Sequence, residues 1–202
     1  MKVKIYVEGG GDGAQLDDVF REGWKCFFEK AGLAGRMPTV VRGKGRSQAF
    51  HNYATAVKNR RKSELLLLLL DSEEPVKPGN SVWQHLKDRP QDNFDRPEGS
   101  GEGDAFLMVC VMETWFLAYQ ETLLAFFGSS LNRKALPKWP NLEDVPSERI
   151  IRALKNAIRE CTKGGYSTGE TSFQLLGKID PAKVEQLPAA RRLLHRLRQL
   201  PR

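Results

Sequence analysis

A glycine-rich turn near the start of the chain carries an acidic residue on each side. The sequence VEGGGDG places Glu8 directly before three glycines and Asp12 directly after them. Glycines let a backbone turn approach a phosphate closely. Carboxylates repel a phosphate unless a cation lies between them. The pattern therefore favours phosphate chemistry that is assisted by a metal ion.

The same letters also match the dinucleotide-binding fingerprint G-x-G-x-x-A. Two features weigh against that interpretation. Glu8 ends the predicted strand at the point where a pyrophosphate would approach. The next predicted strand ends in VRG, whereas the fingerprint expects an acidic residue there to bind ribose. We therefore favour a metal site over a nucleotide cofactor.

Three further acids follow predicted strands. Asp71 ends the run ELLLLLLD, Glu73 stands two residues later, and Glu113 follows AFLMVCVM. Ligands bind where the carboxyl ends of parallel strands meet, and a period of two lets Asp71 and Glu73 point the same way. All-oxygen ligands favour Mg²⁺ or Mn²⁺ over zinc. The candidate metal ligands are Glu8, Asp12, Asp71, Glu73 and Glu113.

Three of these acids also have an ordinary structural interpretation. Asp12 and Glu113 suit the first turn of a helix, where the helix dipole stabilises a negative charge. Glu73 or its neighbour Glu74 suits a solvated loop. Glu8 and Asp71 directly terminate apolar strands, which favours the metal-binding interpretation for these two. The joint pattern argues more strongly than any single member.

The segments that position these acids alternate between strand and helix patterns. Polar–apolar alternation and short apolar runs predict strands, and apolar residues at helical spacing predict helices. The leucine run is short and ends in an acid, so we interpret it as a central parallel strand buried on both faces. The predicted strands are 2–7, 38–42, 64–71 and 105–112, and the predicted helices are 14–31, 47–62 and 113–128.

This order predicts an α/β fold with a mostly parallel, Rossmann-like sheet flanked by helices. We expect an α/β domain over 1–128 and a basic helical extension over 129–202 packed on it. A Pro- and Gly-rich segment at 72–104 predicts a long loop with a helical turn at SVWQHLKD. A loop of this length in a compact domain is usually functional or mobile.

Positive charge is concentrated near the end of the chain. Residues 1–145 hold 20 basic and 20 acidic side chains, whereas residues 146–202 hold 12 and 5, which accounts for the net charge of +7. This excess favours an anionic partner such as nucleic acid, although a basic helix face is often merely solvated. The candidate nucleic-acid contacts are Lys44, Arg46, Arg60, Arg61, Lys62, Arg152, Lys155 and Arg159.

The remaining composition indicates a cytoplasmic protein. Three cysteines lie far apart and fit no metal-ligand spacing, so we expect reduced thiols. Met1 leads directly into a charged strand, so we expect no signal peptide. The longest apolar run, 65–70, is too short to span a membrane, and we expect no membrane partner.

Strand–Glu-Gly followed by strand–Asp-x-acid resembles the TOPRIM domain of topoisomerases, primases and OLD-type nucleases. In that family the glutamate and the acidic pair bind Mg²⁺ and serve phosphodiester chemistry. The resemblance implies those roles for Glu8 and Asp12 in VEGGGD and for Asp71 and Glu73 in LLLDSE. The second acid departs from the usual Asp-x-Asp, since a glutamate has a longer side chain.

A closer match covers nearly the whole chain. The segments LMVCVMETWFLA, YSTGETSFQLLGKIDPAKV and LPAARRLLHRL resemble the bacterial family known as domain of unknown function 4276 (DUF4276), which is regarded as TOPRIM-like. That family commonly has a lysine where this chain has Thr168, so the resemblance implies a catalytic role for Lys163, or for Lys178, in its place. Relatives of this fold often accompany ATPases in phage defence, which makes an ATPase an expected partner.

These observations together predict a Mg²⁺- or Mn²⁺-dependent nuclease. Glu8 is expected to act as a ligand or as the general base for a water, and the basic residues are expected to contact phosphates. The alternative is a non-catalytic component that binds nucleic acid or protein, which the glutamate at 73 and Thr168 favour. Phosphotransfer to a small nucleotide is a third interpretation, and DNA and RNA substrates stay open.

Overall fold

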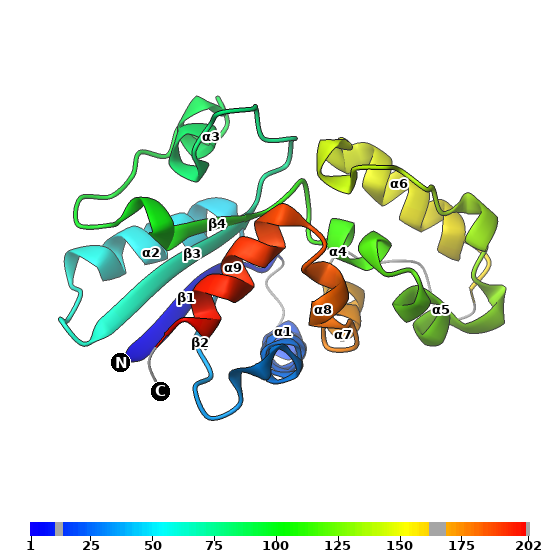
Figure 1. Cartoon of the computed structure of the whole chain (residues 1–202), viewed down its shortest axis with the longest axis horizontal. Coiled ribbons are helices and arrows are strands. Elements are labelled where there is room, and N and C mark those ends of the chain that lie inside the picture. The colour runs from blue at the N-terminus through cyan, green and yellow to red at the C-terminus, as the bar shows by residue number, and fades with distance from the viewer. Residues whose placement is uncertain (11–13, 162–168, 201–202) are drawn as a thin grey trace.

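The computed structural model describes residues 1–10, 14–161 and 169–200. Its centre is a four-stranded, all-parallel sheet in the order β2-β1-β3-β4, with helices on both faces (Figure 1). The α/β class predicted from the sequence is therefore confirmed. The strands are β1 (Lys2–Glu8), β2 (Thr39–Gly43), β3 (Glu64–Asp71) and β4 (Ala105–Met108).

The leucine run forms the central strand β3, as predicted. Its six leucines are between 0 and 9% exposed. They alternate between the two sides of the sheet: Leu65, Leu67 and Leu69 join one hydrophobic core, while the even-numbered leucines join the other. A strand covered on both faces needs apolar residues at every position, which explains why no polar residue interrupts the run.

Two sets of helices cover the two faces of the sheet. The core on one face includes side chains of α1 and α9, and the core on the other includes side chains of α2 and α3. The helices α4, α5 and α6 lie beyond the carboxyl ends of the strands (Figure 1). The α-helices are α1 (Ala14–Phe28), α2 (Arg46–Lys58), α3 (Val82–Asp88), α4 (Glu113–Ala118), α5 (Glu121–Phe127), α6 (Ser147–Ile158), α7 (Glu170–Leu176), α8 (Pro181–Val184) and α9 (Pro188–Arg198).

Shorter helical segments complete the secondary structure. One π-helical segment, Glu29–Leu33, extends α1 and contains Gly32 at φ +82°. Short 3-10 turns connect the other elements in the β3–β4 connection and around α5 and α6. They are Glu102–Asp104, Gly128–Ser130, Arg133–Ala135 and Leu142–Asp144.

Several predicted boundaries differ from those in the structure. The strand predicted over 105–112 ends at Met108, which pairs with Asp71, the last residue of β3. The helix predicted over 113–128 is broken between α4 and α5, where Tyr119 has φ −140° and ψ 83°. The helix predicted over 47–62 ends at Lys58. The helical turn predicted in 72–104 is confirmed as α3.

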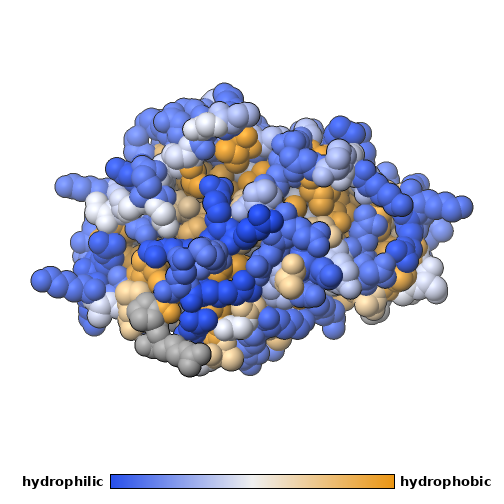
Figure 2. All heavy atoms as spheres, viewed as in Figure 1, coloured by the Kyte–Doolittle hydropathy of each residue, from blue (hydrophilic) through white to orange (hydrophobic). Residues whose placement is uncertain are grey.

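The segments after residue 128 share a core with the sheet. Helix α7 packs against α1 so closely that a Cβ at Gly23 would lie 2.4 Å from the Phe173 carbonyl oxygen. Helix α9 packs on β4 and supplies buried leucines. Its outward face carries exposed Arg191 and Arg192, and Figure 2 shows strongly hydrophilic residues over this helix.

Two further observations bear on the predictions about membrane spans and cysteines. The described residues form no helix with the length and apolar character needed to cross a membrane. Cys26, Cys110 and Cys161 are unpaired thiols.

Candidate metal centre

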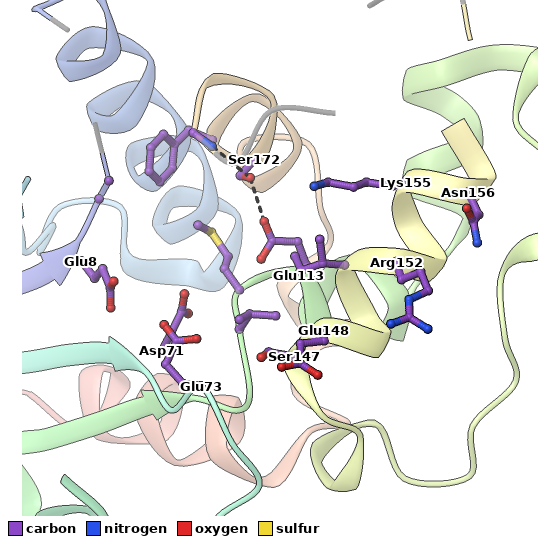
Figure 3. A pocket seen from close by; sticks show the side chains of 17 residues that line it. Glu8, Asp71, Glu73, Glu113, Ser147, Glu148, Arg152, Lys155, Asn156 and Ser172 are labelled. Carbon is purple, nitrogen blue, oxygen red and sulfur yellow. Dashed lines mark hydrogen bonds between the residues drawn. The ribbon is translucent and has the colours of Figure 1, made fainter. Parts of the chain in front are cut away.

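Three predicted metal ligands meet at the carboxyl ends of β1 and β3. Glu8, Asp71 and Glu73 each offer a carboxylate oxygen, and these oxygens lie within 4.8 Å of one another. The sheet register explains this, because Val7 pairs with Leu69 and both strands end within two residues of that pair. Figure 3 shows the three side chains on one side of a cavity.

Glu73 reaches the cluster through a turn and not through strand alternation. Strand β3 ends at Asp71, and Glu73 has a left-handed backbone with φ +65°. Its amide donates a hydrogen bond of 2.6 Å to the Cys110 carbonyl. A left-handed conformation is unfavourable for a residue with a side chain and occurs often at functional sites. The predicted convergence of Asp71 and Glu73 is present, but its geometric basis differs.

Burial and neighbouring acids disfavour the charged forms of Glu8 and Asp71. Burial raises the pKa of Glu8, and the neighbouring Glu73 adds to this effect. The pKa of Asp71 is raised well above its ordinary value, first by burial and then by the charges of Glu8, Glu113 and Glu73. The Arg46 guanidinium opposes both shifts. Carboxylates that are held together in this way are stabilised by a bound cation.

One oxygen of Asp71 supports a metal ligand role. Its Oδ1 atom is enclosed and has no hydrogen-bond partner among the described residues. A buried polar atom without a partner raises the free energy of the folded state. Three carboxylates with one such oxygen fit a hard cation such as Mg²⁺ or Mn²⁺. Glu8, Asp71 and Glu73 are therefore the residues that can hold it.

Glu113 lies beside this group and not within it. It begins α4, is 5% exposed, and accepts a hydrogen bond of 3.0 Å from Ser172 Oγ. It lines the same cavity as the three acids and adds to the raised pKa of Asp71. Of the predicted catalytic and metal residues, Asp12 and Lys163 lie outside the described residues, as does Thr168. Lys178 lines a different hollow, beside Cys26.

The cavity has Glu8, Asp71 and Glu73 on one side, and its α6 wall carries Arg152 and Lys155 together with the acidic Glu148. It measures about 700 Å³, and α6 forms its second wall. Arg152 and Lys155 of α6 are exposed and line it together with Ser147 and Asn156. Figure 3 shows this wall opposite the carboxylates. The structure thus brings two of the predicted nucleic-acid contacts to the candidate metal site.

Other predicted nucleic-acid contacts lie elsewhere. Arg60, Arg61 and Lys62 are exposed and precede β3, so they lie at the opposite end of this strand from Asp71. Eight strand residues separate them from the cluster by roughly 20–25 Å at about 3.3 Å per residue. Lys44 is exposed in the turn between β2 and α2, and Arg159 is exposed directly after α6.

Arg46 has a different environment from the one predicted. Arg46 was predicted to contact nucleic acid, but its side chain is 11% exposed and forms ion pairs with Glu8 and Asp92. Its Nη1 atom lies 3.5 Å from Glu8 Oε2 and donates to the Asp71 carbonyl. Asp92, which the sequence interpretation omitted, binds the other edge of the guanidinium. The guanidinium of Arg46 already makes hydrogen bonds to these partners, so we treat Arg46 as part of the carboxylate cluster.

Arg42 was also missed as a residue of the site. It lies in β2, and its Nε atom donates a hydrogen bond of 2.7 Å to the Gly9 carbonyl. Its Nη2 atom donates at 3.2 Å to the Gly10 carbonyl, and Nη1 pairs with Asp17. Arg42 thereby holds the start of the glycine turn against β2. Its place near the end of a strand beside the glycine turn was the available signal.

Comparison with known families assigns the chain. The sequence model of the family described as "Domain of unknown function (DUF4276)" matches residues 7–198. The chain belongs to this family. The match covers β1 from Val7 through α9, so it includes the carboxylates and the α6 wall of the cavity. No curated protein and no solved structure matches the chain.

Proposed function

We propose that this DUF4276 protein is a Mg²⁺- or Mn²⁺-dependent nuclease that cleaves phosphodiester bonds of nucleic acid. The observation that carries the proposal is the cavity itself, in which three carboxylates within 4.8 Å of one another face Arg152 and Lys155. A phosphodiester needs a cation near its reacting oxygens and positive groups around its neighbouring phosphates. The resemblance of the strand-end acids to those of TOPRIM domains supports the same chemistry.

The residues take the following roles in this proposal. Glu8, Asp71 and Glu73 hold the cation, which supplies Lewis-acid stabilisation of the charge that develops on the scissile phosphate. Glu8 is also placed to accept the proton of an attacking water, and its raised pKa makes it a stronger base than an exposed glutamate. Arg152 and Lys155 contact phosphates of the bound strand, largely without regard to sequence.

A cleavage assay tests the proposal. Labelled single- and double-stranded DNA and RNA are incubated with the protein in Mg²⁺, Mn²⁺ or EDTA. We expect metal-dependent cleavage that falls by about 100-fold or more in Glu8→Gln and in Asp71→Asn, because each removes a metal ligand. Glu74→Gln is the matched control, since Glu74 is an exposed neighbour outside the cluster.

The same assay contains the contrary outcome. Salt-sensitive binding without cleavage, unchanged in Glu8→Gln and Asp71→Asn, would contradict the nuclease proposal and favour a non-catalytic component that binds nucleic acid. The predicted ATPase partner and cytoplasmic location belong to this proposal too. Adding a candidate ATPase to the assay measures whether cleavage depends on it.

A further inference from the structure

Arg46 contacts the carboxylate cluster at the ends of β1 and β3. It is the first residue of α2, and its side chain is 11% exposed. Its Nη1 atom donates to the Asp71 carbonyl, at the end of β3, and lies 3.5 Å from Glu8 Oε2. One nitrogen thus approaches both strands that supply the cluster. Arg46 is not among the described residues that line the cavity, whereas Arg152 and Lys155 are.

The opposite edge of the guanidinium is fixed by Asp92 in the β3–β4 connection. Arg46 Nε donates to Asp92 Oδ1 at 2.7 Å, and Nη2 donates to Oδ2 at 2.6 Å. The Asp92 side chain is 3% exposed and also accepts a hydrogen bond of 2.5 Å from Arg89 Nη1. A two-point contact of this kind fixes the plane and direction of a guanidinium. Arg46 is therefore held in place from outside the cluster.

We propose that Arg46 is a built-in counter-ion of the metal site, anchored by Asp92, which offsets the mutual repulsion of Glu8, Asp71 and Glu73 before a cation binds. Like charges a few ångströms apart in a partly buried site repel strongly, and a fixed positive charge beside them reduces that repulsion. Arg46 is thus a positioning residue for the ligands. The inference rests on the proposed function in one respect, because it treats the three acids as a metal site.

The counter-ion has an opposite effect once a cation arrives. The guanidinium repels a divalent ion held by the same carboxylates, and it has already reduced the repulsion that the ion would relieve. Removing the positive charge should therefore destabilise the metal-free protein and strengthen metal binding. Removal of an arginine with a purely structural role would destabilise the metal-free protein without strengthening metal binding. The two effects together distinguish the counter-ion from an ordinary buried ion pair.

Titration calorimetry with Mn²⁺ on the full chain tests this inference. We expect Arg46→Gln to bind Mn²⁺ about tenfold more tightly than the unaltered protein, because charges at such distances interact by more than 1 kcal/mol. Arg89→Gln is the matched control: Arg89 bonds the same Asp92 oxygen, and its loss should leave the Mn²⁺ affinity nearly unchanged. Equal or weaker Mn²⁺ binding by Arg46→Gln would overturn the inference.

A double-mutant cycle, measured on the metal-free protein, tests the inference independently of the proposed function. Urea unfolding in EDTA compares the effect of Arg46→Gln alone with its effect in a Glu8→Gln background. We expect the loss in urea midpoint to shrink when Glu8 is already neutral, because less repulsion is left to offset. An equal loss in both backgrounds overturns the counter-ion. Absence of Mn²⁺ binding by the unaltered protein, with the expected cycle, would instead contradict the metal part of the proposed function.

Discussion

Asp71 combines an enclosed oxygen that has no hydrogen-bond partner in the described structure with three acidic neighbours. Its folded-state pKa lies above the ordinary value of an aspartate, so the folded protein binds a proton more tightly than the unfolded chain does. The stability that this proton gives is present below the unfolded pKa. It is lost as the pH rises through the raised folded pKa.

This sign gives a testable pH dependence. In EDTA at pH 7–8, Asp71→Asn should be more stable than the unaltered protein by about 1 kcal/mol or more, since each pKa unit corresponds to about 1.4 kcal/mol. Below about pH 3 the difference should disappear, because the aspartate is then largely protonated in both states. Urea unfolding of both proteins across this range measures it. A destabilised Asp71→Asn at pH 8 would show that the carboxylate stabilises the metal-free fold.

The sequence predicted some residues of the site and missed others for a physical reason. Glu8 and Asp71 were predictable because each ends an apolar strand, and parallel strands end at one edge. Glu73 was predicted from strand alternation, although a left-handed turn places it. Arg46 and Asp92 are 46 residues apart. Their pairing depends on how the β3–β4 connection folds over α2, and neither residue stands in a local motif.

At the scale of elements, periodicity predicted the strands and helices better than their ends. The leucine run was predicted as a strand and not as a helix because it is short and ends in an acid. The end of β4 was not predicted, because its apolar letters continue to residue 112 while its partner strand ends at Asp71. Regular pairing of β3 and β4 stops at Asp71 and Met108, and beyond it the amide of Glu73, in a left-handed turn, donates to the Cys110 carbonyl. Predicting such a boundary requires the pairing register of the two strands, which cannot be derived from the sequence of one segment alone.

The contact between α1 and α7 gives a prediction at this scale. A Cβ at Gly23 would lie 2.4 Å from the carbonyl oxygen of Phe173, a distance that forces the two helices apart. Gly23→Ala should therefore lower the free energy of unfolding by about 1–3 kcal/mol, despite the better helix propensity of alanine. Chemical denaturation measures the change. An unchanged or raised stability would mean that α7 moves away without cost.

Gly103 supplies the matched control for this substitution. It is exposed in a 3-10 turn, and a Cβ there would meet no atom within 4 Å. Gly103→Ala should change stability by no more than about 0.5 kcal/mol. Comparable losses at Gly23 and Gly103 would point to backbone effects in place of helix packing.

At the scale of the whole molecule, positive charge gathers in distinct places. One set lines the carboxylate cavity on α6, and another, at residues 60–62, precedes β3 at the far end of the sheet. Under the proposed function, a nucleic-acid strand bound across the cavity would contact the first set directly. The net charge of +7 did not distinguish these places, because a count of charged residues does not show where they lie in the folded protein.

The separation of these two sets predicts unequal effects on nucleic-acid binding. Replacing Arg152 and Lys155 with glutamine should weaken binding and lower the slope of log affinity against log salt by up to about 2, since each lost phosphate contact removes about 1. The same change at Arg60 and Arg61 should lower it less. Fluorescence anisotropy at several salt concentrations measures both. Equal slopes for the two pairs would argue that the strand does not cross the cavity.

The two walls of the cavity come from distant parts of the chain. The three clustered carboxylates belong to residues 8–73, and the wall that carries Arg152 and Lys155 belongs to α6 at 147–158. Only tertiary packing joins them, so each wall can change by mutation while the other stays intact. Substitutions on the outer turns of α6 would then select which anion enters, with the cation ligands preserved. Under the proposed function, the same strand-end acids then serve different substrates when only the α6 wall is changed.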